Sequence, residues 1–400
     1  MNWSCNAILE EVRKNEILVN GQRNVTDRGT MGTEANYEEA MNLQKTTTMQ
    51  ETDRKCPQCG GTMDYDPALS RLHCPFCDYT EEIKTDDTKP LKAQELKLEE
   101  AEFTENFDWG TEQKTVTCKS CGATTVYDAL EVANECPYCG SNQVMEAAGV
   151  RTMAPGGVVP FRIDRKTAGE RFKSWLGHKL FCPKEAKESA KAESFTGIYL
   201  PYWTFDADTH STYTGEYGYQ KKRKNGDKEE VYYEWHRGSG QFSKFIDDEL
   251  VCACGDNHDK YILSSIEPFK TDENVAYKPE YIAGFAAERY ALGVKDAWKK
   301  AKEAIKEELK SLAGNKLQSE HSAQSTRNVQ VSSTFENITY KYLLLPIWIS
   351  SFTYKGKVYQ FMVNGQSGKV GGKSPISPWR VLVAILIAVL IIVLIAYMSS

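Results

Sequence analysis

The segment Gly197-Ile-Tyr-Leu-Pro-Tyr-Trp-Thr-Phe205 contains a Leu-Pro-x-Trp element that returns later in the chain as Leu344-Leu-Pro-Ile-Trp348. Apolar and aromatic residues fill both segments, which is typical of buried β-strands. An identical element in similar surroundings indicates an internal repeat. The two segments therefore predict two related strands in a shared core.

The surroundings of the two strands follow the same order. A helical pair is predicted over residues 164–193, broken at a Cys-Pro step where proline suits the first turn of a second helix. An amphipathic helix is predicted over residues 279–312, ahead of the second strand. Each strand precedes an Asn-Gly pair, at 225–226 and at 364–365, which is a strong hairpin signal. The order of helix, strand and hairpin predicts a duplicated α+β unit.

Eight of the twelve cysteines form four Cys-x-x-Cys pairs, grouped as two modules. Within each module fourteen residues separate the two pairs, and corresponding cysteines of the two modules lie 62 residues apart. This spacing indicates a duplicated zinc ribbon. The ligands that we assign are Cys56, Cys59, Cys74 and Cys77 in the first ribbon, and Cys118, Cys121, Cys136 and Cys139 in the second.

The chemistry of these modules favours two structural Zn²⁺ ions. A Cys-x-x-Cys pair bends the backbone into a knuckle whose sulfurs reach one metal ion at ~2.3 Å. Glycines after the pairs, such as Gly60, Gly61, Gly122 and Gly140, permit these turns. Because four cysteines close each site, no position remains for the water that catalytic zinc requires. His73 could compete as a ligand, but the repetition of four cysteines favours the all-cysteine set.

Cys252, Cys254 and His258 suggest a third metal site, or a thiol nucleophile beside a histidine. However, Cys-x-Cys lacks the spacing of a knuckle, and no carboxylate can be placed as an orienting partner. Buried free cysteine commonly behaves as a small hydrophobic residue. We therefore assign no function to these residues, and Cys182 and Cys5 likewise have no evident partner in the sequence.

Residues 381–398 form an uninterrupted apolar run of eighteen residues. As a helix this run is about 27 Å long, close to the ~30 Å thickness of the hydrocarbon layer of a bilayer. Trp379 and Arg380 stand at its entrance, with Lys369 and Lys373 upstream. The positive-inside rule then places the N-terminal bulk of the protein in the cytoplasm. We expect a single-pass protein of the cell membrane, held in the bilayer by this segment.

The net charge of −6 argues against a strongly basic nucleic-acid binder, because affinity for polynucleotides comes mainly from Lys and Arg side chains that neutralise phosphates. One basic cluster, residues 221–224, marks the tip of the first predicted hairpin. It could contact phosphate or anionic lipid, although a charged hairpin end is usually only solvated. We expect the tyrosines and tryptophans around it, such as Tyr217 and Trp235, to form cross-strand packing pairs rather than a base-stacking platform.

Composition and motifs divide the chain into six segments, and the fold class that they predict is α+β. Few aromatics and no sustained period indicate a poorly ordered N-terminal extension. The segments are the extension (1–54), zinc ribbon 1 (55–80), an acidic linker (81–113), zinc ribbon 2 (114–149), the duplicated α+β domain (157–374) and the transmembrane helix (379–398).

Four elements together resemble bacterial membrane-anchored zinc-ribbon proteins of the YdjG type, which contain a TFIIB-type zinc ribbon. These elements are Cys136-Pro-Tyr-Cys139-Gly-Ser141, Val159-Pro-Phe161, Gly197-Ile-Tyr-Leu-Pro-Tyr-Trp203 and Tyr359-Gln-Phe-Met-Val-Asn-Gly-Gln-Ser-Gly-Lys-Val370. The resemblance runs from about residue 55 to the C-terminus. It implies a membrane platform that works with flotillin-like and PspA-like proteins in envelope stress.

The predicted function is a non-enzymatic, membrane-tethered scaffold that recruits cytoplasmic partner proteins. The sequence shows no nucleophile with a placed base, no open metal site and no cofactor loop, so no catalytic residue is assigned. The alternative is a membrane-attached nucleic-acid-binding or transcription-related zinc-ribbon protein. That alternative needs a basic face, for which residues 221–224 are the one candidate.

Overall fold

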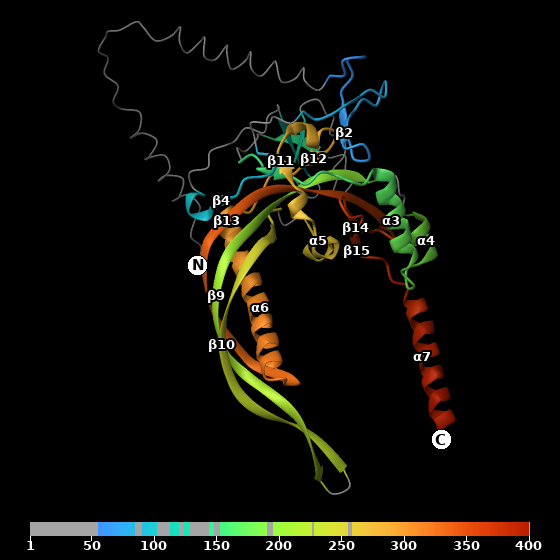
Figure 1. Ribbon diagram of the computed structural model, residues 1–400. Coiled ribbons are helices and arrows are strands. Elements are labelled where there is room, and N and C mark those ends of the chain that lie inside the picture. Colours follow the sequence, from blue (N-terminus) through green and yellow to red (C-terminus); the bar gives the residue numbers. More distant parts are fainter. Residues whose placement is uncertain are drawn as a thin grey trace, which may run out of the picture. The chain divides into compact units, whose positions relative to one another are not determined.

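The computed structural model describes residues 55–84, 90–101, 113–119, 124–128, 144–147, 153–189, 195–225, 228–254 and 258–399 (Figure 1). The predicted N-terminal extension and part of the predicted linker lie outside these residues. So do Cys121, Cys136 and Cys139, three of the four ligands assigned to the second ribbon.

The described elements confirm the α+β class, with a cluster of cysteines near the start and one apolar helix near the end. The strands are β1 (Asp64–Asp66), β2 (Arg71–His73), β3 (Thr80–Glu81), β4 (Leu96–Lys97), β5 (Gln113–Cys118), β6 (Thr124–Asp128), β7 (Val144–Ala147), β8 (Gly157–Val158), β9 (Thr196–Asn225), β10 (Lys228–Cys252), β11 (Val275–Ala276), β12 (Ala286–Ala287), β13 (Ser325–Tyr354), β14 (Lys357–Asn364) and β15 (Val370–Gly372). The α-helices are α3 (Arg165–Gly177), α4 (Lys184–Ser189), α5 (Lys260–Ile266), α6 (Val294–Glu320) and α7 (Pro378–Ser399). The 3₁₀ turns are η1 (Leu98–Glu100), η2 (Thr271–Glu273) and η3 (Pro279–Ile282).

The two long strands that carry the Leu-Pro-x-Trp elements, β9 and β13, pair with each other antiparallel. Leu200 of the first element lies opposite Leu345 of the second, and both side chains are fully buried. On its other edge β9 pairs with β10, and β13 pairs with β14. The repeated segments therefore form the centre of the largest sheet, as their apolar composition predicts (Figure 1).

Equivalent leucines lie opposite each other, which is the register expected of two copies related by a local two-fold axis. The short parallel strands obey the same relation, because β8 pairs with β13 at Leu343–Leu344 and β12 pairs with β9 at Ile198–Tyr199. The two tryptophans also follow this relation, because each donates to a carbonyl at an equivalent place in its repeat. Trp203 Nε1 donates to Leu292 O at 2.8 Å, and Trp348 Nε1 donates to Ile163 O at 3.0 Å.

Two local predictions differ from the structure. The helix predicted over 279–312 begins only at Val294, because the segment before it joins the sheet through β12, between β9 and β6, and Gly293 occupies the helix N-cap. The Asn-Gly pair at 364–365 does close the predicted hairpin, but this hairpin joins β14 to β15 and does not directly follow the Leu-Pro-x-Trp strand β13. The turn between β13 and β14 uses Lys355 and Gly356, both at positive φ (50° and 72°). The predicted first hairpin does form, since Asn225 at the end of β9 lies opposite Lys228 at the start of β10.

Helix α6 packs along β9, β10 and β13 through one row of side chains. The row repeats every fourth residue, so it forms a continuous ridge that is inclined to the helix axis. All of its members are fully buried, and three of them are alanines that let the helix approach the sheet closely. The row comprises Ala297, Ala301, Ile305, Leu309, Ala313 and Leu317.

A buried ion cluster ties the centre of the sheet to its edge. Lys341 Nζ lies 2.7 Å from Asp248 Oδ1, 3.2 Å from Asp206 Oδ2 and 3.3 Å from Glu95 Oε1. Burial opposes the charge of Lys341, but Asp248 and Asp206 together raise its pKa above the ordinary value. Burial also opposes ionisation of Asp248, yet its hydrogen bonds with Lys341 and Thr271 lower its pKa.

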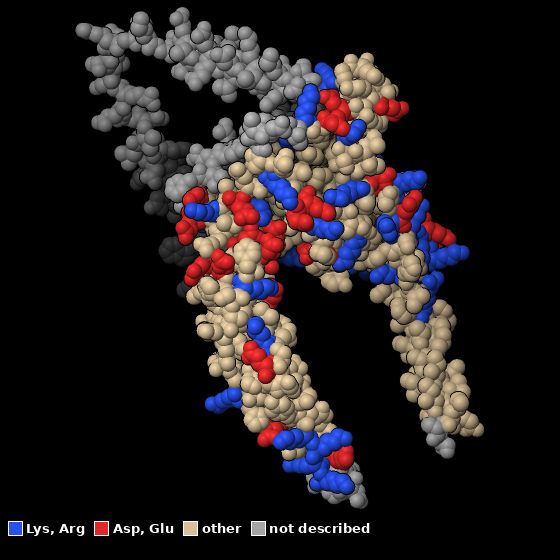
Figure 2. Space-filling view, viewed as in Figure 1, with Lys and Arg blue, Asp and Glu red and all other residues tan. Residues whose placement is uncertain are grey.

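Helix α7 differs from the other helices in composition. It extends as an uninterrupted uncharged segment in Figure 2, below the charged surface of the domain. Its mean hydropathy is 3.4, and none of the segment Pro378–Met398 is buried against the protein. It is the one helix among the described residues that is long and apolar enough to cross a membrane.

Replacing Lys341 by methionine should destabilise the folded protein by about 3–5 kcal/mol, because the buried carboxylates of Asp206 and Asp248 lose their cation. Denaturant unfolding of the detergent-solubilised protein, followed by tryptophan fluorescence, measures the effect. Lys310→Met, on the exposed face of α6, is the matched control and should change stability by less than about 0.5 kcal/mol. Adding Asp206→Asn and Asp248→Asn to Lys341→Met should recover part of the loss. Equal effects of Lys341→Met and Lys310→Met would contradict the assigned role.

Candidate metal centre

The first predicted ribbon folds as a three-stranded antiparallel sheet, β1-β2-β3. One knuckle, 56–61, precedes β1, and the other, 74–79, connects β2 to β3. Because β1 and β2 form a hairpin in which Asp64 lies opposite His73, the two knuckles meet at the same end of the sheet.

The two knuckles have the same backbone hydrogen bonds. In the first, Cys56 N donates to Gly61 O at 2.7 Å and Gly60 N donates to Cys56 O at 2.8 Å. In the second, Cys74 N donates to Tyr79 O at 2.8 Å and Asp78 N donates to Cys74 O at 3.0 Å. The residue after the second cysteine has positive φ in both knuckles, 75° at Gly60 and 59° at Asp78. This conformation explains the glycine at position 60, as the sequence predicts.

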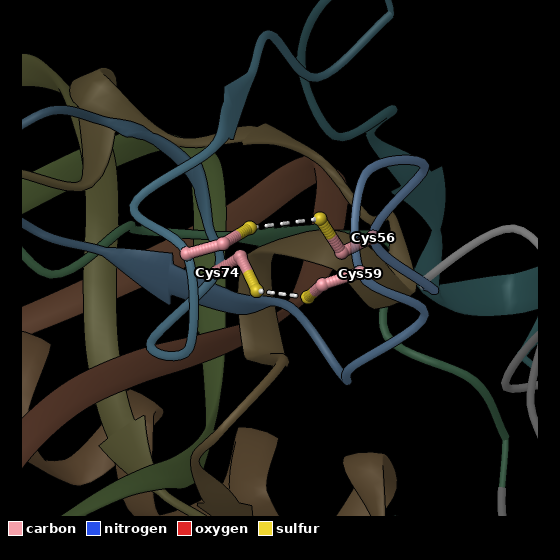
Figure 3. A group of neighbouring side chains, drawn as sticks. Cys56, Cys59 and Cys74 are labelled. Atoms are coloured by element: carbon pink, nitrogen blue, oxygen red, sulfur yellow. Dashed lines mark hydrogen bonds between the residues drawn. The ribbon is translucent and has the colours of Figure 1, made fainter.

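The sulfurs of the four cysteines converge between the knuckles (Figure 3). Cys56 Sγ lies 3.4 Å from Cys77 Sγ, and Cys59 Sγ lies 3.5 Å from Cys74 Sγ. All four sulfurs lie within 4.8 Å of one another. A tetrahedron of thiolates at ~2.3 Å from a central Zn²⁺ has edges of about 3.8 Å, so this group could hold such an ion.

The electrostatics of the cluster favour a bound cation. Although burial opposes ionisation, backbone hydrogen bonds with Cys59 and Gln58 lower the pKa of Cys56 to about 7. A backbone hydrogen bond with Tyr79 favours the Cys77 thiolate, but burial and the neighbouring sulfurs together raise its pKa to about 12. Ionisation of Cys77 is therefore opposed by the negative charge of the Cys56 thiolate. A divalent cation at the centre removes this repulsion.

His73 does not belong to the group of four sulfurs. Its Nε2 lies instead 3.3 Å from Asp78 Oδ1. The apolar core around the sulfurs is small and consists of Met63, Leu72 and Ala283 beside the buried cysteines. Such a core supplies little folding free energy, so bound metal should supply much of it.

Ribbon 1 is also attached to the α+β domain. Tyr65 N donates to Ala283 O at 3.1 Å, and the ring of Tyr65 contacts that of Tyr281 edge-on at 5.8 Å. The linker therefore does not leave this ribbon free of the domain, which the sequence could not show because Tyr65 and Ala283 lie 218 positions apart.

Of the second ribbon, the structure describes β5, β6 and β7, which pair antiparallel in the order β6-β5-β7. Cys118 ends β5 and is buried. Val126 of β6 pairs with Ala287 of β12, which joins this sheet to the α+β domain. The convergence of its four assigned ligands stays a prediction.

The structure adds a carboxylate to Cys254 and His258, two of the residues that the sequence suggests as a third metal site. Ligand atoms of Cys254, His258 and Glu288 lie within 4.8 Å of one another. The expectation that no carboxylate can be placed beside these residues is wrong, because the fold brings Glu288 there from 30 positions beyond His258. No local pattern in the sequence could have identified Glu288 as their neighbour.

Replacing Cys59 by serine should lower the zinc content of the purified protein by one ion per chain relative to the unmodified protein, because three thiolates no longer close the site. Elemental analysis of detergent-solubilised protein measures the loss. Cys182→Ser is the matched control, since Cys182 is buried and belongs neither to the four-cysteine cluster nor to the group of Cys254, His258 and Glu288. Unchanged zinc content in Cys59→Ser would refute the assignment.

Comparison with known proteins yields one similar bacterial chain. No protein-family model and no solved structure matches this protein. The uncharacterized protein YdjG of Bacillus subtilis (strain 168) is 27% identical over 338 residues, which cover 82% of this chain and 91% of YdjG. The chain is therefore similar to YdjG over most of its length, as the resemblance of its motifs implies.

Proposed function

We propose that this protein is a membrane-tethered zinc-ribbon scaffold that recruits cytoplasmic proteins to the membrane, with flotillin-like or PspA-like partners in envelope stress. The observation that carries the proposal is α7, a wholly exposed apolar helix on a chain that also holds a four-cysteine cluster. A closed four-thiolate site leaves no position for a catalytic water, so we give it a structural role. Anchoring would raise the effective concentration of partners at the membrane surface.

The exposure of α7 supports insertion into a bilayer. Large side chains on every face of the helix are at least half exposed, among them Ile385, Leu390 and Ile395. A helix that is apolar all round has no stable environment in water, and it is long enough to cross the hydrocarbon layer. The bilayer is the solvent that such a helix requires.

The junction between α7 and the domain has the character of a membrane interface. Ser377 N donates to Phe181 O at 2.8 Å, and Arg380 Nη1 donates to Cys182 O at 2.8 Å, so the helix starts against the turn between α3 and α4. Leu180 of that turn is 79% exposed, and Trp379 is 70% exposed. Exposed apolar and tryptophan side chains at the start of a transmembrane helix suit the headgroup region.

The charges around this junction support a cytoplasmic domain. Figure 2 shows Lys and Arg side chains gathered on the elements from which α7 emerges. An excess of basic residues next to a transmembrane helix marks its cytoplasmic side. Lys179 and Lys184 flank the turn that contacts α7, and Lys369, Lys373 and Arg380 precede or begin the helix.

The charges of the β9–β10 tip favour protein partners over nucleic acid. Lys222 Nζ lies 3.2 Å from Glu229 across the hairpin, and Arg223 lies 2.8 Å from Glu230. Lys221 forms an ion pair with Glu234. These glutamates offset the basic residues on which the alternative function depends, so the tip offers little net charge to phosphates.

Ending the chain after Ser377 should release the protein from membranes, because this truncation removes α7 and leaves every strand of the described domain in place. Fractionation and carbonate washing of cells that express each form measure the change. Circular dichroism of the released protein checks that it is folded. A folded, truncated protein that still resists carbonate washing would contradict the assigned anchor.

Capture experiments distinguish the two functions. Tagged full-length protein, purified in detergent, should retain flotillin-like or PspA-like proteins at both low and moderate salt. A Cys59→Ser and Cys74→Ser variant should lose a partner that binds ribbon 1, whereas Cys182→Ser should keep it. Retention of polynucleotide with a steep loss as salt rises, and without protein partners, would support the nucleic-acid alternative instead.

A further inference from the structure

The group that contains Cys254, His258 and Glu288 lies where three segments meet beside the first Leu-Pro-x-Trp element. Cys252 ends β10, and Ala253 N donates to Pro201 O at 2.9 Å. Glu288 follows β12, and its backbone N donates to Tyr199 O at 2.9 Å. Backbone hydrogen bonds of the central strand thus hold both Cys252–Cys254 and Glu288 in place.

The side chains of this group are enclosed by the protein. The side chains of His258 and Glu288 are only 2% and 9% exposed, and His258 Nε2 lies 2.7 Å from Glu288 Oε2. Cys252 and Cys254 pack against the second apolar core, which contains Ile198, Leu200 and Tyr202. A carboxylate in such surroundings requires a compensating charge or donor. Thiolate, imidazole and carboxylate together form a donor set that suits Zn²⁺.

The local two-fold relation shows what stands at the same place in the second repeat. Cys252 lies opposite Tyr202, and Asn364 lies opposite Ile347, the corresponding residue of the second Leu-Pro-x-Trp element. The next residue in each chain segment donates to the proline carbonyl, as Ala253 does to Pro201 and Gly365 does to Pro346 at 2.8 Å. Cys252 and Cys254 therefore occupy the positions that Asn364 and Gln366 occupy in the other repeat.

In the second repeat, these two positions hold a chain segment by amide hydrogen bonds. Asn364 Nδ2 donates to Ile266 O at 3.0 Å, while its Oδ1 accepts from Gln366 N at 2.9 Å. Gln366 Oε1 accepts from Lys270 N at 2.9 Å, and its Nε2 donates to Glu273 Oε2 at 2.6 Å. Thiols are weak hydrogen-bond donors and acceptors. The cysteines therefore cannot make hydrogen bonds equivalent to those of Asn364 and Gln366. They are, however, strong metal ligands.

We propose that Cys252, Cys254, His258 and Glu288 form a further metal site for a divalent cation of the zinc class, which clips the end of β10 to the segments before α5 and after β12. Four donors complete a tetrahedron, so the site is structural. It is independent of the scaffold function, because none of its residues belongs to a ribbon or to α7.

The site binds metal in its reduced form. Cys252 and Cys254 are joined as a disulfide in the structure, and a disulfide sulfur is not a thiolate ligand. A dithiol reductant transfers two electrons and two protons to this disulfide and becomes a disulfide itself. The two protein thiols then each release a proton as the metal binds. Oxidation by a disulfide reverses these steps and releases the metal.

Zinc counting tests the site in the full-length, detergent-solubilised protein. The protein is reduced with a phosphine, saturated with Zn²⁺, freed of excess metal and analysed for zinc per chain. His258→Gln and the double variant Cys252→Ser, Cys254→Ser should each bind one ion fewer than the unmodified protein. His210→Gln, at an exposed histidine of β9, and Cys182→Ser are the matched controls and should bind the full number. Equal zinc content in all folded variants would overturn the proposal.

A second measurement needs no variant. In the reduced, unmodified protein, bound Zn²⁺ should protect Cys252 and Cys254 from alkylation, and a chelator should expose them; mass spectrometry of the peptide that contains both reports the difference. Alkylation at the same rate with and without zinc would also overturn the proposal. The alkylation rate tests metal binding by these cysteines even where a variant fails to fold.

Discussion

The antiparallel pairing of β9 with β13 is the constraint on which the rest of the structure depends. It sets Leu200 opposite Leu345 in the centre of the sheet, where both side chains are removed from water. Proline has no N–H to donate to a ladder, and a proline within a central strand is therefore unusual. Here Pro201 and Pro346 still accept hydrogen bonds through their carbonyls from the strands outside them. One pairing thus positions both outer strands and, through the two tryptophan indoles, the entries to α3 and α6.

The metal-binding groups are arranged around one short segment of this frame, residues 283–288. Ala283 accepts a hydrogen bond from ribbon 1, Ala287 pairs with a strand of the second predicted ribbon, and Glu288 belongs to the buried group with His258. The ribbons are therefore attached to the domain at neighbouring positions. A structural ion in either ribbon would therefore lie close to the part of the central sheet that contains β12.

The charged groups of the domain serve two different purposes. Lys341, Asp206 and Asp248 are largely removed from water. The cost of this desolvation is offset only while all three charges are paired. The basic residues near the start of α7, such as Lys369, Lys373 and Arg380, are exposed at the surface. The glutamates opposite residues 221–224 reduce the positive charge of the hairpin tip.

The sequence by itself determined the features that depend on neighbouring residues: the Cys-x-x-Cys knuckles, the Asn225–Gly226 hairpin and the apolar run of α7. Each rests on spacing or composition within a few turns of chain, so it could be predicted together with the α+β class. Only the tertiary structure decided where α6 begins, how ribbon 1 contacts the domain, and that Glu288 lies beside His258. Those features require residues far apart in sequence to be brought together by the pairing of β9 with β13, and no local pattern encodes the free energy of that pairing.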